Sequence, residues 1–205
     1  MECQAVTRTG DEVESVSSGA AAVEQTILDA ARACVAEFGV RRTTLTEVAR
    51  RAGVSRPTVY RRWADSRALV AELLVRELRE IIAAAVPTTG PARERLVTGV
   101  VTGAAEVRSN PLFGKIFRTD TDLMLTYVFG RLGRNQRQLL ELFDTGIRDG
   151  QADGSVRAGE PDRLAAMVLL ITQSAVQSAA TVAHLLDGSA LDTELRHALD
   201  SYLAP

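Results

Sequence analysis

A short run of hydroxyl-bearing and basic side chains is the part of this 205-residue chain whose residue types best suit a chemical task. It spans Ser55 to Arg62 and reads SRPTVYRR. Arginine presents a planar fork of N–H donors that can bind phosphate oxygens or a guanine edge, and hydroxyl groups add further bonds to phosphate. Arg56 and Thr58 stand early enough in the run to reach base edges, and Pro57 can press on a thymine methyl group. The run therefore indicates contact with a nucleic acid.

Residues for catalysis or metal binding are not gathered anywhere in the sequence. His184 and His197 lie in separate segments, and neither has a carboxylate or cysteine at a spacing typical of metal ligands. Cys3 and Cys34 show no metal-type or disulfide pattern, which favours a reducing compartment. No phosphate-binding glycine loop is present either. We therefore expect no enzyme activity, no cofactor and no metal.

The segment Thr44–Trp63, TLTEVARRAGVSRPTVYRRW, is expected to form two short helices joined by a tight turn. Thr44 and Glu47 have the spacing of a capping box, which satisfies free N–H groups at a helix start. Gly53 follows the first helix at a position where a left-handed backbone costs little. Ser55 can cap the second helix, and a proline two residues later is tolerated in a first turn. This is the pattern of a helix-turn-helix with a basic recognition helix.

Positive charge is concentrated on the same segment, although the whole chain has a formal net charge of −2. Residues 23–65 contain eight arginines and five acidic residues and are net +3, whereas residues 1–22 are net −3 and residues 66–205 are net −2. Phosphate binding requires this uneven distribution. The excess is modest, so we expect a small footprint on DNA and help from a second copy of the chain.

The segment from Val23 to about Leu74 resembles the DNA-binding domain of the TetR (tetracycline repressor) family. The resemblance rests on many residues at fixed spacing: Phe38-Gly39, Thr43-Thr44-Leu45, Ala49, Ala52-Gly53-Val54-Ser55, Thr58-Val59-Tyr60-Arg61-Arg62-Trp63 and Ser66-Arg67-Ala68-Leu69. It covers about a quarter of the chain, and the rest matches only in helical architecture. Trp63 stands where the family usually has phenylalanine, and the N-terminal arm lacks the basic run that some members use in the minor groove.

The resemblance implies an all-α protein, with a three-helix DNA-binding domain followed by a helical domain for ligand binding and dimerisation. We expect a disordered arm over residues 1–22, the DNA-binding domain over 23–65 and the second domain over 66–205. The residues expected to contact DNA, with Arg62 included on charge alone, are Thr44, Ser55, Arg56, Pro57, Thr58, Tyr60, Arg61, Arg62 and Arg67.

Apolar spacing predicts further helices over about 23–38, 67–85, 92–108, 112–118, 122–149, 161–186 and 191–203. The segment from Asp162 to Leu186 has apolar or small residues on nearly every side, and a helix of that kind must be buried all round. In a chain of this length such burial usually takes a second subunit, so a homodimer through residues 162–186 and 191–203 is expected. The alternative is a central helix in a monomer. No transmembrane run and no signal peptide are evident, so we expect a cytoplasmic protein without a membrane partner.

Aromatic residues and methionines gather in the middle of the chain, where the resemblance implies a small-molecule pocket. For any single residue an ordinary place in the core is favoured, but collectively they indicate a cavity, with Thr172 and Gln173 among the candidate polar contacts. The residues expected to bind a ligand are Val97, Val101, Ala104, Phe113, Phe117, Met124, Tyr127, Phe143, Met167, Ile171 and Ser174.

Taken together, these patterns predict a homodimeric regulator of transcription. The favoured interpretation is a repressor released from a near-palindromic double-stranded operator by a small apolar or amphipathic molecule. One alternative is a dimeric helical protein that binds a small molecule and has a vestigial DNA-binding domain. Another is an architectural DNA-binding protein without a ligand.

Overall fold

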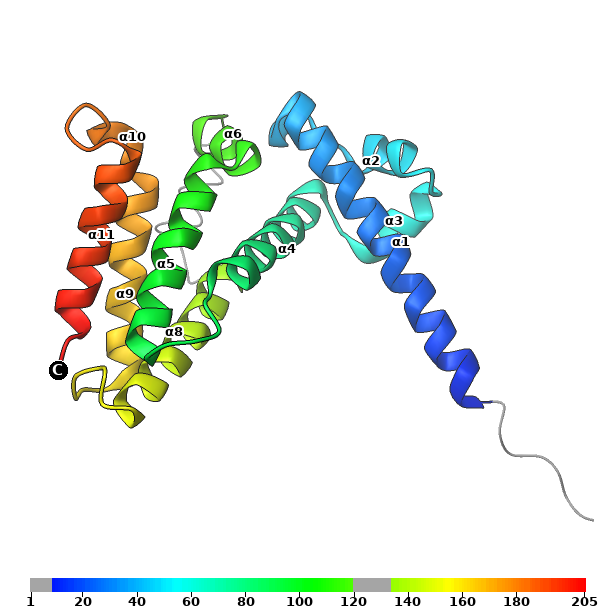
Figure 1. Cartoon of the computed structure of the whole chain (residues 1–205). Helices are drawn as coiled ribbons and strands as arrows, with labels where there is room; N and C mark the ends of the chain where they lie inside the picture. The colour runs from blue at the N-terminus through cyan, green and yellow to red at the C-terminus, as the bar shows by residue number, and fades with distance from the viewer. Residues whose placement is uncertain (1–8, 120–133) are drawn as a thin grey trace, which may run out of the picture. The chain divides into compact units, whose positions relative to one another are not determined.

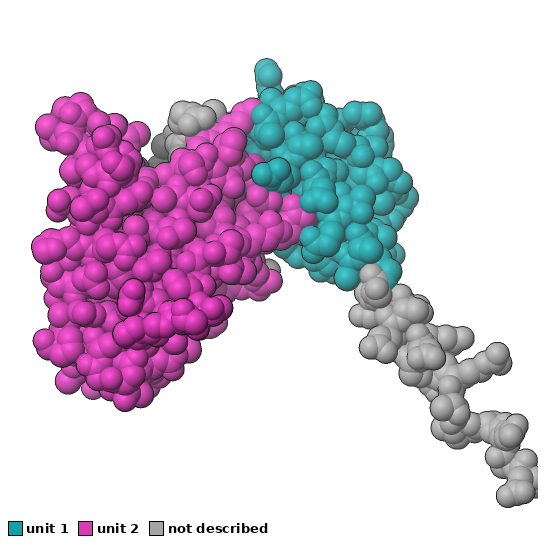
Figure 2. All heavy atoms as spheres, in the orientation of Figure 1, with its two compact units in different colours: residues 1–73 teal, residues 74–205 magenta. Residues whose placement is uncertain are grey.

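The computed structural model describes residues 9–119 and 134–205, with side chains for residues 19–116 and 136–205. The described backbone is helical between its loops and contains no strand, as Figure 1 shows, which confirms the predicted all-α class. The chain divides into two compact units, Met1–Leu73 and Leu74–Pro205 (Figure 2). The boundary falls inside a helix, eight residues later in the sequence than the predicted boundary after residue 65.

Unit 1 consists of α1 (Thr9–Phe38), the short 3-10 helix η1 (Val40–Arg42), α2 (Leu45–Ala52), α3 (Arg56–Arg62) and the beginning of α4 (Ser66–Ala85). α1 begins well before the predicted start at residue 23, so its backbone continues through part of the segment that was expected to be disordered. Alanine and glutamate in this stretch favour a helix. The core of unit 1 is formed by Ile27, Leu28, Ala31, Cys34, Val35, Val48, Val59, Trp63 and Leu69.

Unit 2 contains the rest of α4 and the helices α5 (Ala92–Ser109), α6 (Pro111–Thr119), α8 (Arg134–Ala152), α9 (Pro161–Gln177), α10 (Ala179–Val182) and α11 (Gly188–Leu203). In Figure 1, α5, α8, α9 and α11 lie side by side, and these four helices pack on one another. Their shared core includes Val97, Val101, Phe143, Ile147, Val168, Leu195 and Leu199.

One predicted helix of unit 2 ends earlier in the structure than expected, and the predicted start of another lies outside the described residues. The helix expected over 161–186 ends at Gln177, and Ser178 separates it from the one-turn helix α10. Serine disfavours a helix interior because its hydroxyl competes for backbone hydrogen bonds, and small residues around it offer little packing to offset this. The helix expected from residue 122 is described only from Arg134, since residues 120–133 lie outside the described part of the chain.

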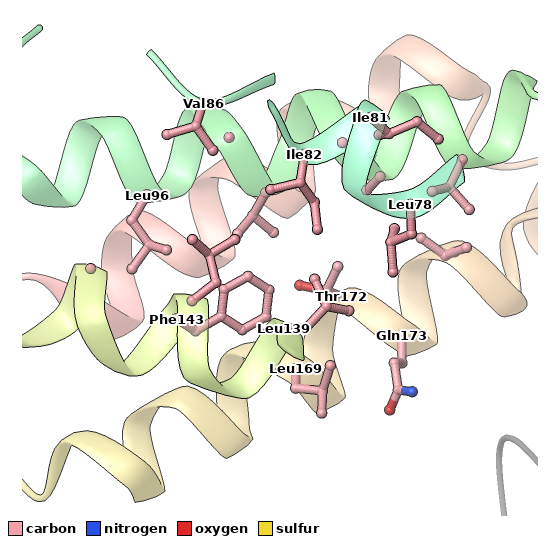
Figure 3. A pocket seen from close by; sticks show the side chains of 18 of the residues that line it. Leu78, Ile81, Ile82, Val86, Leu96, Leu139, Phe143, Leu169, Thr172 and Gln173 are labelled. Atoms are coloured by element: carbon pink, nitrogen blue, oxygen red, sulfur yellow. The ribbon is translucent and has the colours of Figure 1, made fainter. Parts of the chain in front are cut away.

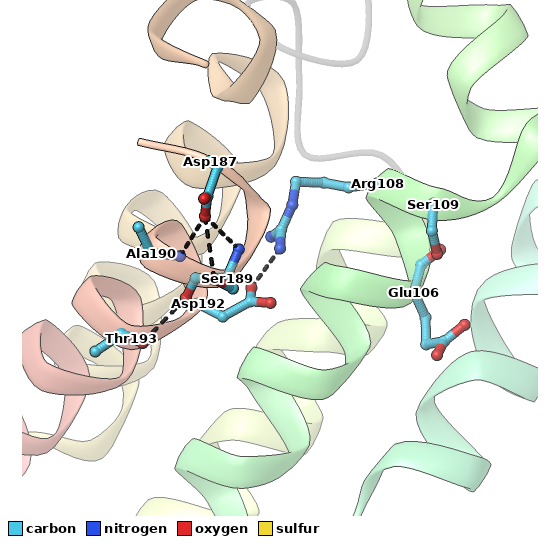
Figure 4. Close-up of polar contacts among 8 residues, drawn as sticks. All are labelled: Glu106, Arg108, Ser109, Asp187, Ser189, Ala190, Asp192 and Thr193. Carbon is cyan, nitrogen blue, oxygen red and sulfur yellow. Dashed lines mark hydrogen bonds and ion pairs between the residues drawn. The ribbon is translucent and has the colours of Figure 1, made fainter. Parts of the chain in front are cut away.

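Polar contacts fix α11 at both ends, and Figure 4 shows those at its N-terminal end. The Asp187 carboxylate accepts hydrogen bonds from the backbone N–H groups of Ala190 at 2.8 Å and Ser189 at 3.0 Å. The Ser189 hydroxyl also donates to this carboxylate, at 3.1 Å. Together these bonds lower the pKa of Asp187, with the bond from the Ala190 N–H contributing most and that from the Ser189 hydroxyl next. Arg108 reaches from α5 to pair with Asp192 in the first turns of α11. At the other end, Arg157 donates to the Tyr202 carbonyl at 2.8 Å.

Candidate nucleic-acid interface and apolar cavity

The turn between α2 and α3 is built by local capping. Thr44 Oγ1 accepts a hydrogen bond from the Glu47 backbone N–H at 3.2 Å, and Ser55 Oγ accepts one from the Thr58 backbone N–H at 3.3 Å. Gly53 ends α2 with φ of 68°, a left-handed conformation that favours glycine. These contacts place the start of α3 at the surface, with Val59 buried beneath it.

Most of the side chains expected to contact DNA are exposed on this surface. Ser55, Arg56, Pro57, Arg61 and Arg67 are exposed, and Thr58 is half-buried. Thr44 is also exposed. Tyr60 is 52% exposed, and its hydroxyl lies 3.4 Å from Thr46 Oγ1 on α2. The structure thus brings the start of α2 close to Tyr60 of α3, so that residues of both helices can contact the same stretch of DNA backbone.

The arginines of unit 1 divide into paired and unpaired groups. Arg50 pairs with Glu47 at 2.6 Å, and this contact lowers the pKa of the Glu47 carboxyl. Arg51 pairs with Glu37 at 2.6 Å. By contrast, Arg56, Arg61 and Arg67 form no ion pair with any residue that the structure describes, so their guanidinium groups are available to a ligand.

Arg62 differs from the other residues predicted to contact DNA. Its guanidinium lies 2.5 Å from the Glu24 carboxylate on α1 and 3.7 Å from the Glu72 carboxylate on α4. It also stacks over the Trp63 ring, 5.6 Å from the ring centroid. Arg62 was predicted to contact DNA on its charge alone. That prediction did not include the ion pair with Glu24, because the two residues are far apart in the sequence.

Unit 2 holds a cavity of about 310 Å³ whose described lining is almost wholly apolar. Leu78, Ile81 and Ile82 of α4, Leu96 of α5, Leu139 and Phe143 of α8 and Leu169 of α9 surround it, as Figure 3 shows. Its size lies at the lower end of the range for small-molecule sites. The leucines and isoleucines of α4 were not among the residues expected to bind a ligand, since apolar spacing predicted the helix but not what its apolar side faces.

Of the residues expected to bind a ligand, Ala104, Phe113 and Phe143 line this cavity. Val97 and Val101 do not line it but lie in the core that α5 shares with its neighbours. Each is one position beyond a lining residue, Leu96 or Val100, and one residue turns a helix by about 100°. The side chains of three others lie outside the described part: Phe117, Met124 and Tyr127.

Polar groups in the described lining are few. Gln136, Thr172, Gln173 and Gln177 contribute amides or hydroxyls, and the Thr172 hydroxyl donates to the Val168 carbonyl at 2.7 Å. Arg95 and Asp149 also line the cavity, and their charged groups are 3.7 Å apart. Each of these two charges is therefore compensated by the other.

The remaining three predicted ligand contacts, Met167, Ile171 and Ser174, lie elsewhere. They line a shallow groove between α9 and α11 together with Leu170, Ala175, Leu191, Leu195 and Ala198. Met167 is 42% exposed and Leu170 is 60% exposed. A single copy of the chain thus leaves an apolar face of α9 uncovered, and residues that sequence reasoning assigned to a pocket lie on this face.

Residues 27–73 match the family model described as bacterial regulatory proteins, tetR family. Over 189 residues the chain is 45% identical to an uncharacterized HTH-type transcriptional regulator of Mycobacterium tuberculosis strain H37Rv, covering 92% of this chain and 98% of the relative. This chain belongs to the TetR family of transcriptional regulators. The predicted membership is therefore confirmed, and the helix-turn-helix of unit 1 is the DNA-binding element of that family.

Solved structures share this fold over most of the chain. A TetR-family regulator from Rhodococcus sp. superposes with a TM-score of 0.68 at 19% identity, covering 89% of this chain and 98% of that one. The regulator FadR from Bacillus subtilis, solved in complex with stearoyl-CoA, gives a TM-score of 0.63 at 17% identity and covers 87% and 98%. None of the helices described here is long and apolar enough to cross a lipid bilayer.

Proposed function

We propose that this TetR-family regulator is a repressor that leaves its operator when a small apolar or amphipathic molecule fills the cavity of unit 2. The observation that carries the proposal is the course of α4. Its first residues pack in unit 1, directly after the recognition helix and its C-cap, and from Leu74 onward it lines the cavity. One continuous helix therefore belongs both to the DNA-binding unit and to the cavity wall.

The DNA-binding half of the proposal assigns different roles to the exposed residues. Arg56, Pro57 and Thr58 at the start of α3 read base edges, and Arg56 is suited to guanine. Thr44, Ser55, Tyr60, Arg61 and Arg67 bind phosphates and fix the register without reading sequence. The absence of ion-pair partners for Arg56, Arg61 and Arg67 among the described residues leaves all three available to DNA, and the place of Arg56 at the start of α3 favours it for base contact.

The cavity favours a ligand that is largely apolar. The α4 leucines and isoleucines, Leu139 and Phe143 would cover the ligand, and the glutamine amides and the Thr172 hydroxyl can bond one or two polar groups on it. A charge buried there would need a partner, whereas Arg95 and Asp149 already neutralise each other. The stearoyl-CoA complex of the fold neighbour FadR shows that an amphipathic molecule can be bound within this architecture.

The uncovered face of α9 supports dimerisation through α9 and α11. Met167 and Leu170 are large apolar side chains on a helix surface that lacks charge, which a stable monomer rarely leaves exposed as a patch. A second copy related by a two-fold axis would present the same face to it. The two recognition helices of such a dimer would bind half-sites about 34 Å apart in a near-palindromic operator.

The test uses DNA from immediately upstream of the chain's own gene. Gel-shift titrations against this fragment and against random DNA of equal length measure specific binding. Compounds from a metabolite library that raise the thermal stability of the protein are then added to the complex. We expect at least one such compound to weaken binding to the upstream fragment. Failure to prefer any upstream fragment would indicate a vestigial DNA-binding unit, and a tight ligand without effect on DNA binding would exclude the sensing mechanism.

A further inference from the structure

Trp63 follows the recognition helix directly, as its C-cap, and is 2% exposed. Its indole N–H donates a hydrogen bond to Glu72 Oε2 on α4 at 2.8 Å. An indole N–H buried without an acceptor is costly, and a carboxylate is a strong acceptor. The last residue of the recognition segment is therefore bonded to a specific side chain of α4.

The same carboxylate also faces Arg62. The Arg62 guanidinium lies between Glu72 at 3.7 Å and Glu24 of α1 at 2.5 Å, and it stacks on the Trp63 ring. Four side chains from α1, the end of α3 and α4 thus form one cluster, which we name the Glu72 cluster: Glu24, Arg62, Trp63 and Glu72. The cluster thus places the Arg62 guanidinium against two carboxylates, although its side chain is 51% exposed.

We propose that Glu72 is a positioning residue for operator binding, which holds the C-terminal end of α3 through Trp63 and Arg62. Arg62 then serves this cluster and does not bind phosphate. The inference rests on the proposed function, because it concerns how the recognition helix is aimed at an operator. A phenylalanine at position 63 would fill much of the same core volume but could not make this bond, so the hydrogen bond depends on the tryptophan of this chain.

Glu72 also lies where α4 passes from one unit to the other. Leu74, two residues further along the same helix, lines the cavity. A ligand that changes the position of α4 would therefore act on the end of the recognition helix through the carboxylate of Glu72. This gives the proposed regulation a defined contact, with identified donor and acceptor atoms.

Operator affinity and its salt dependence distinguish a positioning role from phosphate binding. Removing one phosphate-binding side chain changes the slope of log affinity against log salt by about one unit. We expect Trp63→Phe and Glu72→Leu to weaken binding to the upstream fragment on the order of tenfold, the usual effect of removing a charge-assisted hydrogen bond, without changing that slope. Arg62→Gln should also leave the slope unchanged.

Two variants control for a general loss of structure. Glu72→Gln keeps an oxygen that can accept the Trp63 N–H bond and should restore most of the affinity that Glu72→Leu removes. Glu80→Leu makes the same change at an exposed position of α4 outside the cluster and should bind DNA like the wild type. Circular dichroism and thermal unfolding of every variant establish that unit 1 is folded at the temperature of the binding assay.

The fluorescence of the protein adds a direct readout, because Trp63 is its only tryptophan. We expect Glu72→Leu, but not Glu80→Leu, to shift the Trp63 emission. Two results would overturn the inference while the wild type still binds its operator: full affinity in Trp63→Phe and Glu72→Leu, or a slope reduced by about one unit in Arg62→Gln. If the wild type itself binds no upstream fragment, the proposed function fails instead, so the two failures are distinguishable.

Discussion

Arg56 is the first residue of α3, exposed and without an ion-pair partner among the described residues. If it reads a guanine, Arg56→Ala should reduce the free-energy preference for operator over random DNA by roughly 1–3 kcal/mol. Competition gel-shifts with both DNAs measure this preference. An equal loss of affinity for both DNAs would instead make Arg56 a phosphate contact.

Arg61 near the end of α3 and Arg67 at the start of α4 are exposed in the same way. We expect Arg61→Ala and Arg67→Ala each to flatten the salt dependence of operator binding by about one unit of slope, because each removes one phosphate-binding group. Arg50→Ala is a suitable comparison, since Arg50 is held by Glu47. A slope that equals the wild-type value would remove the mutated arginine from the interface.

Single helices in this protein depend on their caps, and α11 is the clearest case. The Asp187 carboxylate binds two backbone N–H groups more strongly when it is ionised, which lowers its pKa. Its contribution to stability is therefore fully present above the pKa of an unfolded aspartate and is lost as pH falls through the lower pKa of the native state. We expect Asp187→Ala to unfold at a lower temperature than the wild type at neutral pH.

The pH dependence provides the check on this cap. The difference in melting temperature between Asp187→Ala and the wild type should shrink as the pH is lowered through the acid range, where the wild-type cap is protonated. Glu194→Ala removes an exposed carboxylate of the same helix that caps nothing, and it should not show this behaviour. A constant difference at every pH would mean that Asp187 acts by packing and not by its charge.

Assembly of the whole regulator is predicted to depend on the exposed face of α9. Leu170→Glu places a charge on a side chain that is 60% exposed in one copy, so the folded monomer should tolerate it. At a dimer interface the same charge would be buried without a partner, so we expect a monomer that no longer binds the operator tightly. Light scattering coupled to size exclusion gives the mass. The matched control is Ala84→Glu, which places the same charge at an exposed site of α4. If Leu170→Glu still has the mass of a dimer, the interface lies elsewhere.

Communication between cavity and operator can be tested by filling the cavity. A Cβ atom at Gly103 would meet only Ala85 and Ile81, both at 3.9 Å, so Gly103→Leu should fit and narrow the site, and Ala104→Trp should narrow it further. Both should abolish the response to a ligand found by thermal shift and leave operator affinity close to the wild-type value.

For the wild type, operator and ligand should weaken each other's binding by the same factor, because coupling between two sites is reciprocal. A ligand that leaves operator affinity unchanged, and whose own affinity the operator leaves unchanged, would contradict the proposed coupling.

The helix-turn-helix could be predicted from the sequence because its signals are local. Thr44, Gly53 and Ser55 each act within a few residues of their own position, and the structure confirms all three as helix caps. The periodicity of apolar residues likewise identified most helices, since it follows from the geometry of a single helix. Family membership rested on these same local patterns.

Only the tertiary structure decided which helix faces meet. Val101 and Ala104 were both expected to bind a ligand, but only the packing of neighbouring helices determines that Ala104 lines the cavity whereas Val101 lies in the core. Met167 is apolar and was taken for a pocket residue, yet it lies on an outer groove. Arg62 is paired with a carboxylate from a distant helix. Spacing along a chain fixes the direction of a side chain relative to its own helix, whereas the residue it meets depends on contacts between segments far apart in the sequence.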